Sequence, residues 1–99
     1  MNPSIRLTVR LNAPGGAQNL TICGREAWAL EQLIQAGKRG CTPIDHPGPR
    51  WSAYIHKLRR MGFDIETIHE THKGPFAGSH GRYVLHSPVE ILPRDEQAA

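Results

Sequence analysis

The stretch that decides the interpretation of this sequence is Arg50-Trp-Ser-Ala-Tyr-Ile-His-Lys-Leu-Arg-Arg-Met61. At about 100° of rotation per residue, a helix places its apolar side chains on one side, and these are Trp51, Tyr54, Ile55, Leu58 and Met61. The other side carries small, polar and basic residues and no acid, namely Ser52, Ala53, His56, Lys57 and Arg60, with Arg50 and Arg59 near the borders. The pattern predicts a helix over residues 50–61 that buries its apolar side, ends at Gly62 and exposes a cationic face.

A second helix is predicted upstream, beginning near Gly24 with Cys23 as a poor N-cap and Gly37 as its stop. Its apolar stripe has helical spacing and consists of Ala27, Leu30, Leu33 and Ile34. The ten residues 40–49 between the helices contain three prolines. Because Thr42 can cap a first turn and Pro47 opposes its continuation, we expect one short helical turn followed by a rigid turn.

Strands are predicted on both sides of these helices. Downstream, residues 65–72 are rich in Ile and Thr, residues 73–81 form a glycine-containing loop, and residues 82–86 form a returning strand. Upstream, residues 5–11 alternate strictly between apolar and polar side chains, which is typical of a half-buried strand, and residues 19–22 are short enough to pair back onto it. The fold class that follows is α+β, with two helices packed on a small antiparallel sheet and an added N-terminal strand or hairpin.

Length and composition are those of one small basic domain. The chain has 99 residues, 38% of them hydrophobic, and a net charge of +3. Residues 1–89 hold eleven Lys and Arg against six Asp and Glu, which gives +5 and suits a polyanionic partner. The N-terminus lacks the pattern of a signal peptide, so a cytoplasmic location is expected and Cys23 and Cys41 are interpreted as reduced, small core residues.

The exposed face of the second helix is interpreted as a DNA-contacting surface. Such a helix fits a major groove about 12 Å wide, where Arg and Lys donate to guanine and Ser to several acceptors. The hairpin that follows offers further cations to the backbone or minor groove. The expected DNA-binding residues are Arg50, Ser52, Ala53, His56, Lys57 and Arg60 on the helix and Lys73, His80 and Arg82 on the hairpin. The alternatives are a merely solvated helix face and a surface loop with incidental charge.

Four segments resemble small bacterial and prophage winged helix-turn-helix proteins. They are Gly24–Leu30, Ala36–Ile44, Arg50–Gly62 and His80–Leu85, and the resemblance extends over residues 20–87. It implies a winged helix fold and a DNA-binding, transcription-regulating role, without an operator or ligand. Cys23 departs from the family pattern, as does the scarcity of regular helix between Thr42 and Pro49.

Other chemistry fits the sequence less well. His69 and His72 point to opposite faces of a strand, and Cys41 with Asp45 and His46 is better explained as a proline-shaped turn. We therefore expect no enzymatic activity, no metal, cofactor or small-molecule substrate, and no membrane association. The rival to DNA binding is a non-catalytic winged-helix adaptor for protein–protein interaction, for instance through residues 5–11 if they lie at a sheet edge.

Three regions are expected along the chain. Residues 1–18 form the N-terminal strand and loop, residues 19–87 the winged helix domain, and residues 88–99 a flexible tail. Double-stranded DNA is the expected partner in a cytoplasmic, nucleoid-associated protein. The sequence leaves open whether one chain contacts a single half-site or a homodimer contacts two.

Overall fold

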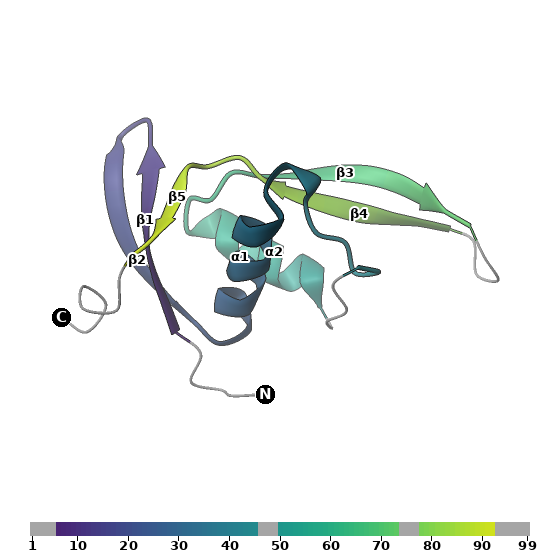
Figure 1. Cartoon of the computed structure of the whole chain (residues 1–99), viewed down its shortest axis with the longest axis horizontal. Helices are drawn as coiled ribbons and strands as arrows, with labels where there is room; N and C mark the ends of the chain where they lie inside the picture. The colour runs from purple at the N-terminus through teal and green to yellow at the C-terminus, as the bar shows by residue number, and fades with distance from the viewer. Residues whose placement is uncertain (1–5, 46–49, 74–77, 93–99) are drawn as a thin grey trace.

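The structure is a computed structural model that describes residues 6–45, 50–73 and 78–92. The elements, in chain order, are β1 (Arg6–Ala13), β2 (Gly16–Cys23), α1 (Gly24–Ala36), the 3-10 turn η1 (Gly37–Arg39), α2 (Trp51–Arg60), β3 (Ile65–His72), β4 (Gly78–Leu85) and β5 (Val89–Ile91). Figure 1 shows the sheet of β1, β2 and β5 at one end, the helices in the middle and the β3–β4 hairpin projecting from the other end. The predicted α+β architecture with an added N-terminal hairpin is confirmed.

The N-terminal sheet is antiparallel in the order β2-β1-β5. The predicted alternation holds in β1, where Leu7, Val9 and Leu11 are buried against the helices. Thr8, on the opposite face, is also buried, and its hydroxyl lies 3.1 Å from the hydroxyl of Thr21 on β2. Because β1 lies between two strands, it is not an edge strand, and the free edge of eight residues belongs to β2.

The sequence predicts a flexible tail from residue 88, but the first part of this segment forms strand β5. Val89–Ile91 pair with β1, and the amide of Leu92 donates to the carbonyl of Thr8 at 3.0 Å. This apolar run is too short for its sequence alone to predict a strand. The hydrogen-bond partners of its backbone come from the adjacent edge of β1. Residues 93–99 of the predicted tail lie outside the described residues.

The β3–β4 hairpin, which forms the wing of the molecule, is longer than the sequence indicated. Residues 78–81 were expected in a loop because they include two glycines, yet β4 begins at Gly78 and pairs with β3 along its whole length. The ladder joins Ile65 to Leu85 at the base and His72 to Gly78 near the tip. Backbone pairing with the Thr- and Ile-rich β3 thus overrides the loop preference of the glycines. The middle of the predicted loop, residues 74–77, lies outside the described residues.

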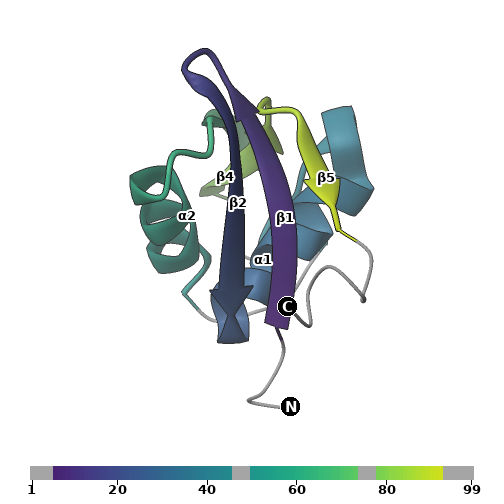
Figure 2. The ribbon, with the colours of Figure 1, turned by 90° about the vertical axis from the view of Figure 1, so that its left-hand side faces the viewer.

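The core lies between the inner face of the three-stranded sheet and the two helices, as Figure 2 shows from the sheet side. β1, β2 and both helices contribute fully buried side chains: Val9, Leu11, Ile22, Ala29, Leu30, Leu33, Ile55 and Leu58. In α2 the expected buried face is confirmed for Trp51, Tyr54, Ile55 and Leu58. Met61 is the exception, because it follows the last helical turn as the C-cap and is 39% exposed.

The link after α1 holds the hairpin against the helices. Cys41 and Tyr83 exchange two backbone hydrogen bonds of 2.8 and 2.9 Å, which adds a single bridge to the edge of β4. Residues 43–45 then form a turn rather than the predicted turn of helix, and the hydroxyl of Thr42 caps it by accepting the amide of Asp45 at 2.9 Å. Pro47 and Pro49 lie outside the described residues.

Gly40 is the position at which this link tolerates no side chain. Its φ is +72°, and a Cβ there would lie 2.6 Å from the carbonyl oxygen of Tyr83. Gly40→Ala is therefore expected to lower the free energy of unfolding by about 2–4 kcal/mol, because the bridge to β4 must open. Gly15→Ala in the β1–β2 turn, where a Cβ meets open space, is the control and should change stability by less than about 0.5 kcal/mol. Equal urea-unfolding free energies for the two variants would contradict this assignment.

Candidate nucleic-acid interface

The orientation of α2 is set by its first residue, Trp51. This side chain is 2% exposed, and its ring centroid lies 5.3 Å from that of Trp28 on α1 and 6.0 Å from that of Tyr83 on β4. The Tyr83 ring is stacked at 19°, and the Trp28 ring is tilted at 52°. Aromatic pairs at these separations attract beyond their buried area. Trp51 therefore joins both neighbouring elements to the start of α2 and turns the opposite side of the helix outward.

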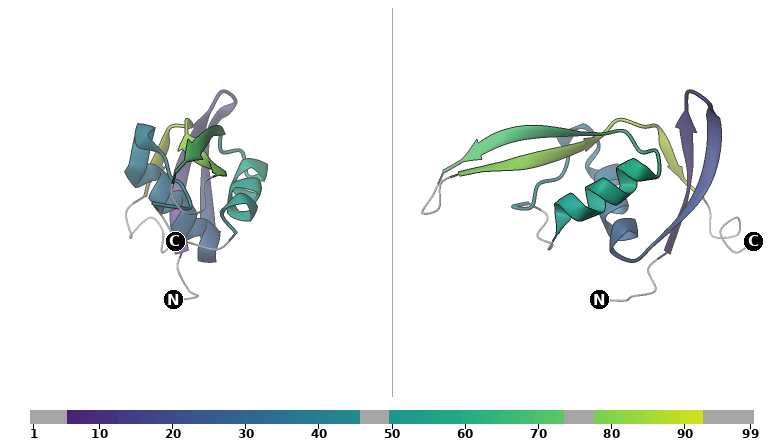
Figure 3. Two further views of the ribbon diagram at one scale, coloured as in Figure 1. Left: turned by 90° about the vertical axis from the view of Figure 1, so that its right-hand side faces the viewer. Right: turned by 180° about the vertical axis from the view of Figure 1, so that it is seen from behind.

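The outward side of α2 carries the residues predicted for DNA contact. Ser52, His56 and Arg60 are exposed, and Ala53 is half-buried. Arg50 precedes the helix as an exposed N-cap with a left-handed φ of 66°. None of the ten residues from Trp51 to Arg60 is acidic. Figure 3 shows α2 from behind, with the hairpin above it and projecting past its N-terminal end.

Lys57 lies on this side but has a protein partner. Its Nζ is 3.0 Å from Oε1 of Glu26, in the first turn of α1. The Lys57 side chain remains 62% exposed, and that of Glu26 is 18% exposed. Ion pairs with one well-solvated member contribute little to stability, so the ammonium group can exchange this partner for a phosphate.

Arg59 is a functional candidate that the sequence placed only at a border of the helix. Its guanidinium donates to the carbonyl of Ile65 through Nε at 3.0 Å and through Nη2 at 2.6 Å, and Nη2 also donates to the hydroxyl of Thr67 at 2.8 Å. These bonds tie the end of α2 to the start of β3. The only sequence signal was its position one residue before Arg60, which does not reveal a contact with the next strand.

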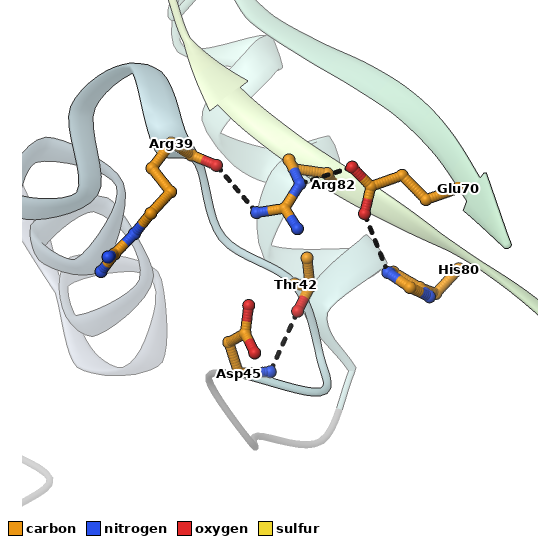
Figure 4. A network of polar contacts seen from close by, with 6 residues as sticks. All are labelled: Arg39, Thr42, Asp45, Glu70, His80 and Arg82. Carbon is orange, nitrogen blue, oxygen red and sulfur yellow. Dashed lines mark hydrogen bonds and ion pairs between the residues drawn. The ribbon is translucent and has the colours of Figure 1, made fainter. Parts of the chain in front are cut away.

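Two of the hairpin residues predicted for DNA contact, Arg82 and His80, are engaged in a network with Glu70, shown in Figure 4. Arg82 donates from Nε to Oε2 of Glu70 at 2.6 Å and from Nη1 to the carbonyl of Arg39 at 2.8 Å. Nε2 of His80 lies 3.2 Å from the other oxygen of Glu70, and the His80 side chain is only 13% exposed. The network ties the hairpin to η1. Lys73, the third predicted cation, is exposed just beyond β3.

The predicted core position is confirmed for Cys41 but wrong for Cys23, which is exposed in the described part of the chain. No group of three His, Cys, Asp or Glu side chains converges there. Cys41 is completely buried, and this burial raises the pKa of its thiol to about 11, against the opposing charges of Arg82 and Arg39. A thiol with this pKa is protonated at neutral pH and a poor nucleophile.

The Glu70 network predicts a loss of stability in acid. The hydrogen bond from Arg82 holds the pKa of Glu70 below its ordinary value, and the charge of Arg82 and the contact with His80 act in the same direction. Because this pKa is lower in the folded state, the stabilisation is present at neutral pH and is lost as the pH falls below about 4.3. Urea unfolding at pH 7, 4 and 3 should show a smaller acid loss in Glu70→Gln than in the unmodified protein. Identical losses would show that the network does not couple to folding.

These features define a class of protein. Two helices connected by residues 37–50, followed by an antiparallel hairpin beside the second helix, make a winged helix-turn-helix fold. The chain belongs to the winged helix domain family, whose model matches residues 19–95. The match extends from β2 through α1, α2 and the hairpin to β5.

The remaining comparisons give no relative from which a function can be transferred. No match was found among curated proteins or among solved structures. Within residues 6–45, 50–73 and 78–92, neither helix has the length and hydrophobicity needed to cross a bilayer.

Proposed function

We propose that this chain binds double-stranded DNA as a transcription regulator, without catalysing a reaction. In this proposal α2 contacts the major groove and the hairpin contacts the backbone or minor groove. The observation that carries the proposal is the exposed face of α2, which is basic and free of acids and is turned outward by the burial of Trp51. The family fold supports it, because winged helix-turn-helix proteins place the second helix of the motif in the major groove.

The dimensions of α2 suit this role. Ten residues give a helix about 15 Å long, and a major groove about 12 Å wide accepts one helix. Ser52 and Ala53 are small, so the first turn can approach base edges closely, while His56 and Arg60 extend further along the same side. A cytoplasmic, nucleoid-associated location is part of the proposal.

Arg60 provides the direct test. Arg60→Glu should weaken binding to a random-sequence duplex about tenfold or more and reduce the slope of log affinity against log salt by about one, because a phosphate contact is lost. Fluorescence anisotropy at several salt concentrations measures both quantities. Arg6→Glu, the same charge change at the exposed first residue of β1, is the matched control and should bind nearly as the unmodified protein does.

Lys57 and its partner Glu26 provide a test in the opposite direction. Glu26→Gln frees the Lys57 ammonium group, so we expect duplex affinity to rise about threefold at low salt. The gain should disappear when Lys57→Gln is added, because no cation is then released. An unchanged affinity in Glu26→Gln would place Lys57 outside the interface.

A protein-interaction role is the second candidate, and one observation favours it. Strand β2 is an eight-residue edge without Lys, Arg, Asp, Glu or Pro, which are the residues that usually protect edge strands. An adaptor that adds a partner strand there would depend weakly on salt and would be insensitive to Arg60→Glu. Amide shifts on adding duplex DNA that concentrate at residues 50–60 and 73–82 would favour DNA binding, and shifts confined to residues 16–23 on adding a partner would favour the adaptor.

A further inference from the structure

The two faces of the β3–β4 hairpin carry different chemistry. Side chains alternate between faces along a strand, and the ladder pairs Thr67 with Tyr83, His69 with Gly81 and Thr71 with Ser79. We call the face with Thr67, His69, Thr71 and Ser79 the hydroxyl face. The opposite face, here called the carboxylate face, holds Glu66, Ile68, Glu70, His80 and Arg82.

Contacts with the rest of the molecule fix the direction of each face. The hydroxyl face begins at α2, because Thr67 accepts a hydrogen bond from Arg59 and Tyr83 stacks on Trp51. The carboxylate face begins at η1, because Arg82 donates to the carbonyl of Arg39. The hydroxyl face is therefore the one that continues from the proposed DNA-contacting helix.

The carboxylate face is unsuited to a polyanion. Both acids of the hairpin strands lie on it, and both already have side-chain partners: Glu70 forms an ion pair with Arg82 and contacts His80, and Glu66 contacts His86 at 2.7 Å. A phosphate approaching Arg82 would have to replace Glu70 at 2.6 Å and would still face its negative charge. The cations of this face therefore serve the fold.

The hydroxyl face has the opposite character. Neither β3 (Ile65–His72) nor β4 (Gly78–Leu85) places an acidic residue on this face. His69, Thr71 and Ser79, which lie on it, are exposed. His69 lies opposite Gly81, so no side chain covers it from across the ladder. Lys73, the first residue after β3, continues the same odd-numbered series and is exposed.

We propose that the sugar–phosphate backbone of duplex DNA lies along the hydroxyl face, over His69, Thr71 and Ser79 towards Lys73, with Arg59 joining this track to α2. The inference rests on the DNA-binding function proposed above and replaces His80 and Arg82 as contacts. Ser, Thr, Lys and Arg side chains commonly donate to phosphate oxygens, and such contacts position a protein without selecting sequence. From Thr67 to Lys73 the track extends about 20 Å at 3.4 Å per residue, enough for several phosphates.

The test uses adjacent residues on opposite faces of β3. His69→Glu places a carboxylate on the hydroxyl face, and Ile68→Glu places one on the carboxylate face at a side chain that is 39% exposed. Duplex affinity, measured by anisotropy on the whole chain, should fall about tenfold in His69→Glu and less than about twofold in Ile68→Glu. Thr71→Glu should behave as His69→Glu does, and thermal unfolding of each variant identifies any loss of folding. If His69→Glu unfolds, Thr71→Glu takes its place in the comparison.

The outcomes separate this inference from the function on which it rests. If Arg60→Glu weakens binding but His69→Glu and Thr71→Glu do not, the hydroxyl face is wrong and the role of α2 stands. If Ile68→Glu weakens binding as strongly as His69→Glu, the assignment of faces is wrong. If the unmodified chain does not bind duplex DNA, both proposals fail. Selective loss in His69→Glu and Thr71→Glu, with stability retained, supports the inference.

Discussion

The packing of Trp51 between Trp28 and Tyr83 is the interaction on which the rest of the structure depends. It brings together α1, the first turn of α2 and the base of the hairpin, three elements that are far apart in sequence. A buried aromatic contact of this kind fixes both the rotation of α2 about its axis and the side of the hairpin that faces it. The direction of every exposed side chain on α2 follows from that rotation. The DNA-contacting role proposed for α2 thus depends on how its apolar side is buried.

Ion pairs divide the basic residues into those that hold the fold and those that remain outward. Arg82 is bound by Glu70 and Arg10 by Glu90, whereas the Lys57 side chain beside Glu26 remains 62% exposed. Within the described residues, Arg60 has no ion pair and is exposed at the end of α2. The positive charge left for a polyanion therefore lies along α2 and beyond it, while Glu70 and Arg82 connect the other face of the hairpin to η1. Net charge alone would not have shown this division.

The sequence predicted the principal elements because their patterns are local. The apolar positions of residues 51–58 repeat at helical spacing, and those of residues 7–11 alternate as in a half-buried strand, so the buried face of each could be assigned before the structure. The limits of the hairpin could not be assigned in this way. Its strand β4 starts at Gly78 because β3 lies opposite. Strand β5 forms because it pairs with the edge of β1 that β2 does not occupy. Neither condition is visible within a short window of sequence.

What the sequence by itself determined is the winged helix-turn-helix class, the basic outward side of α2 and the absence of acids on that helix. The hydrophobic periodicity of the sequence is sufficient for these predictions, because burial of the apolar face of a helix leaves its other side chains exposed. Only the tertiary structure decided which basic side chains already have hydrogen-bond or ion-pair partners within the protein. The partners of Lys57 and Arg59 and the carbonyl of Arg39 beside Arg82 come from other elements of the fold. Ion pairs and hydrogen bonds act over a few ångströms in space, and side chains that are distant in the chain meet only after the core has formed.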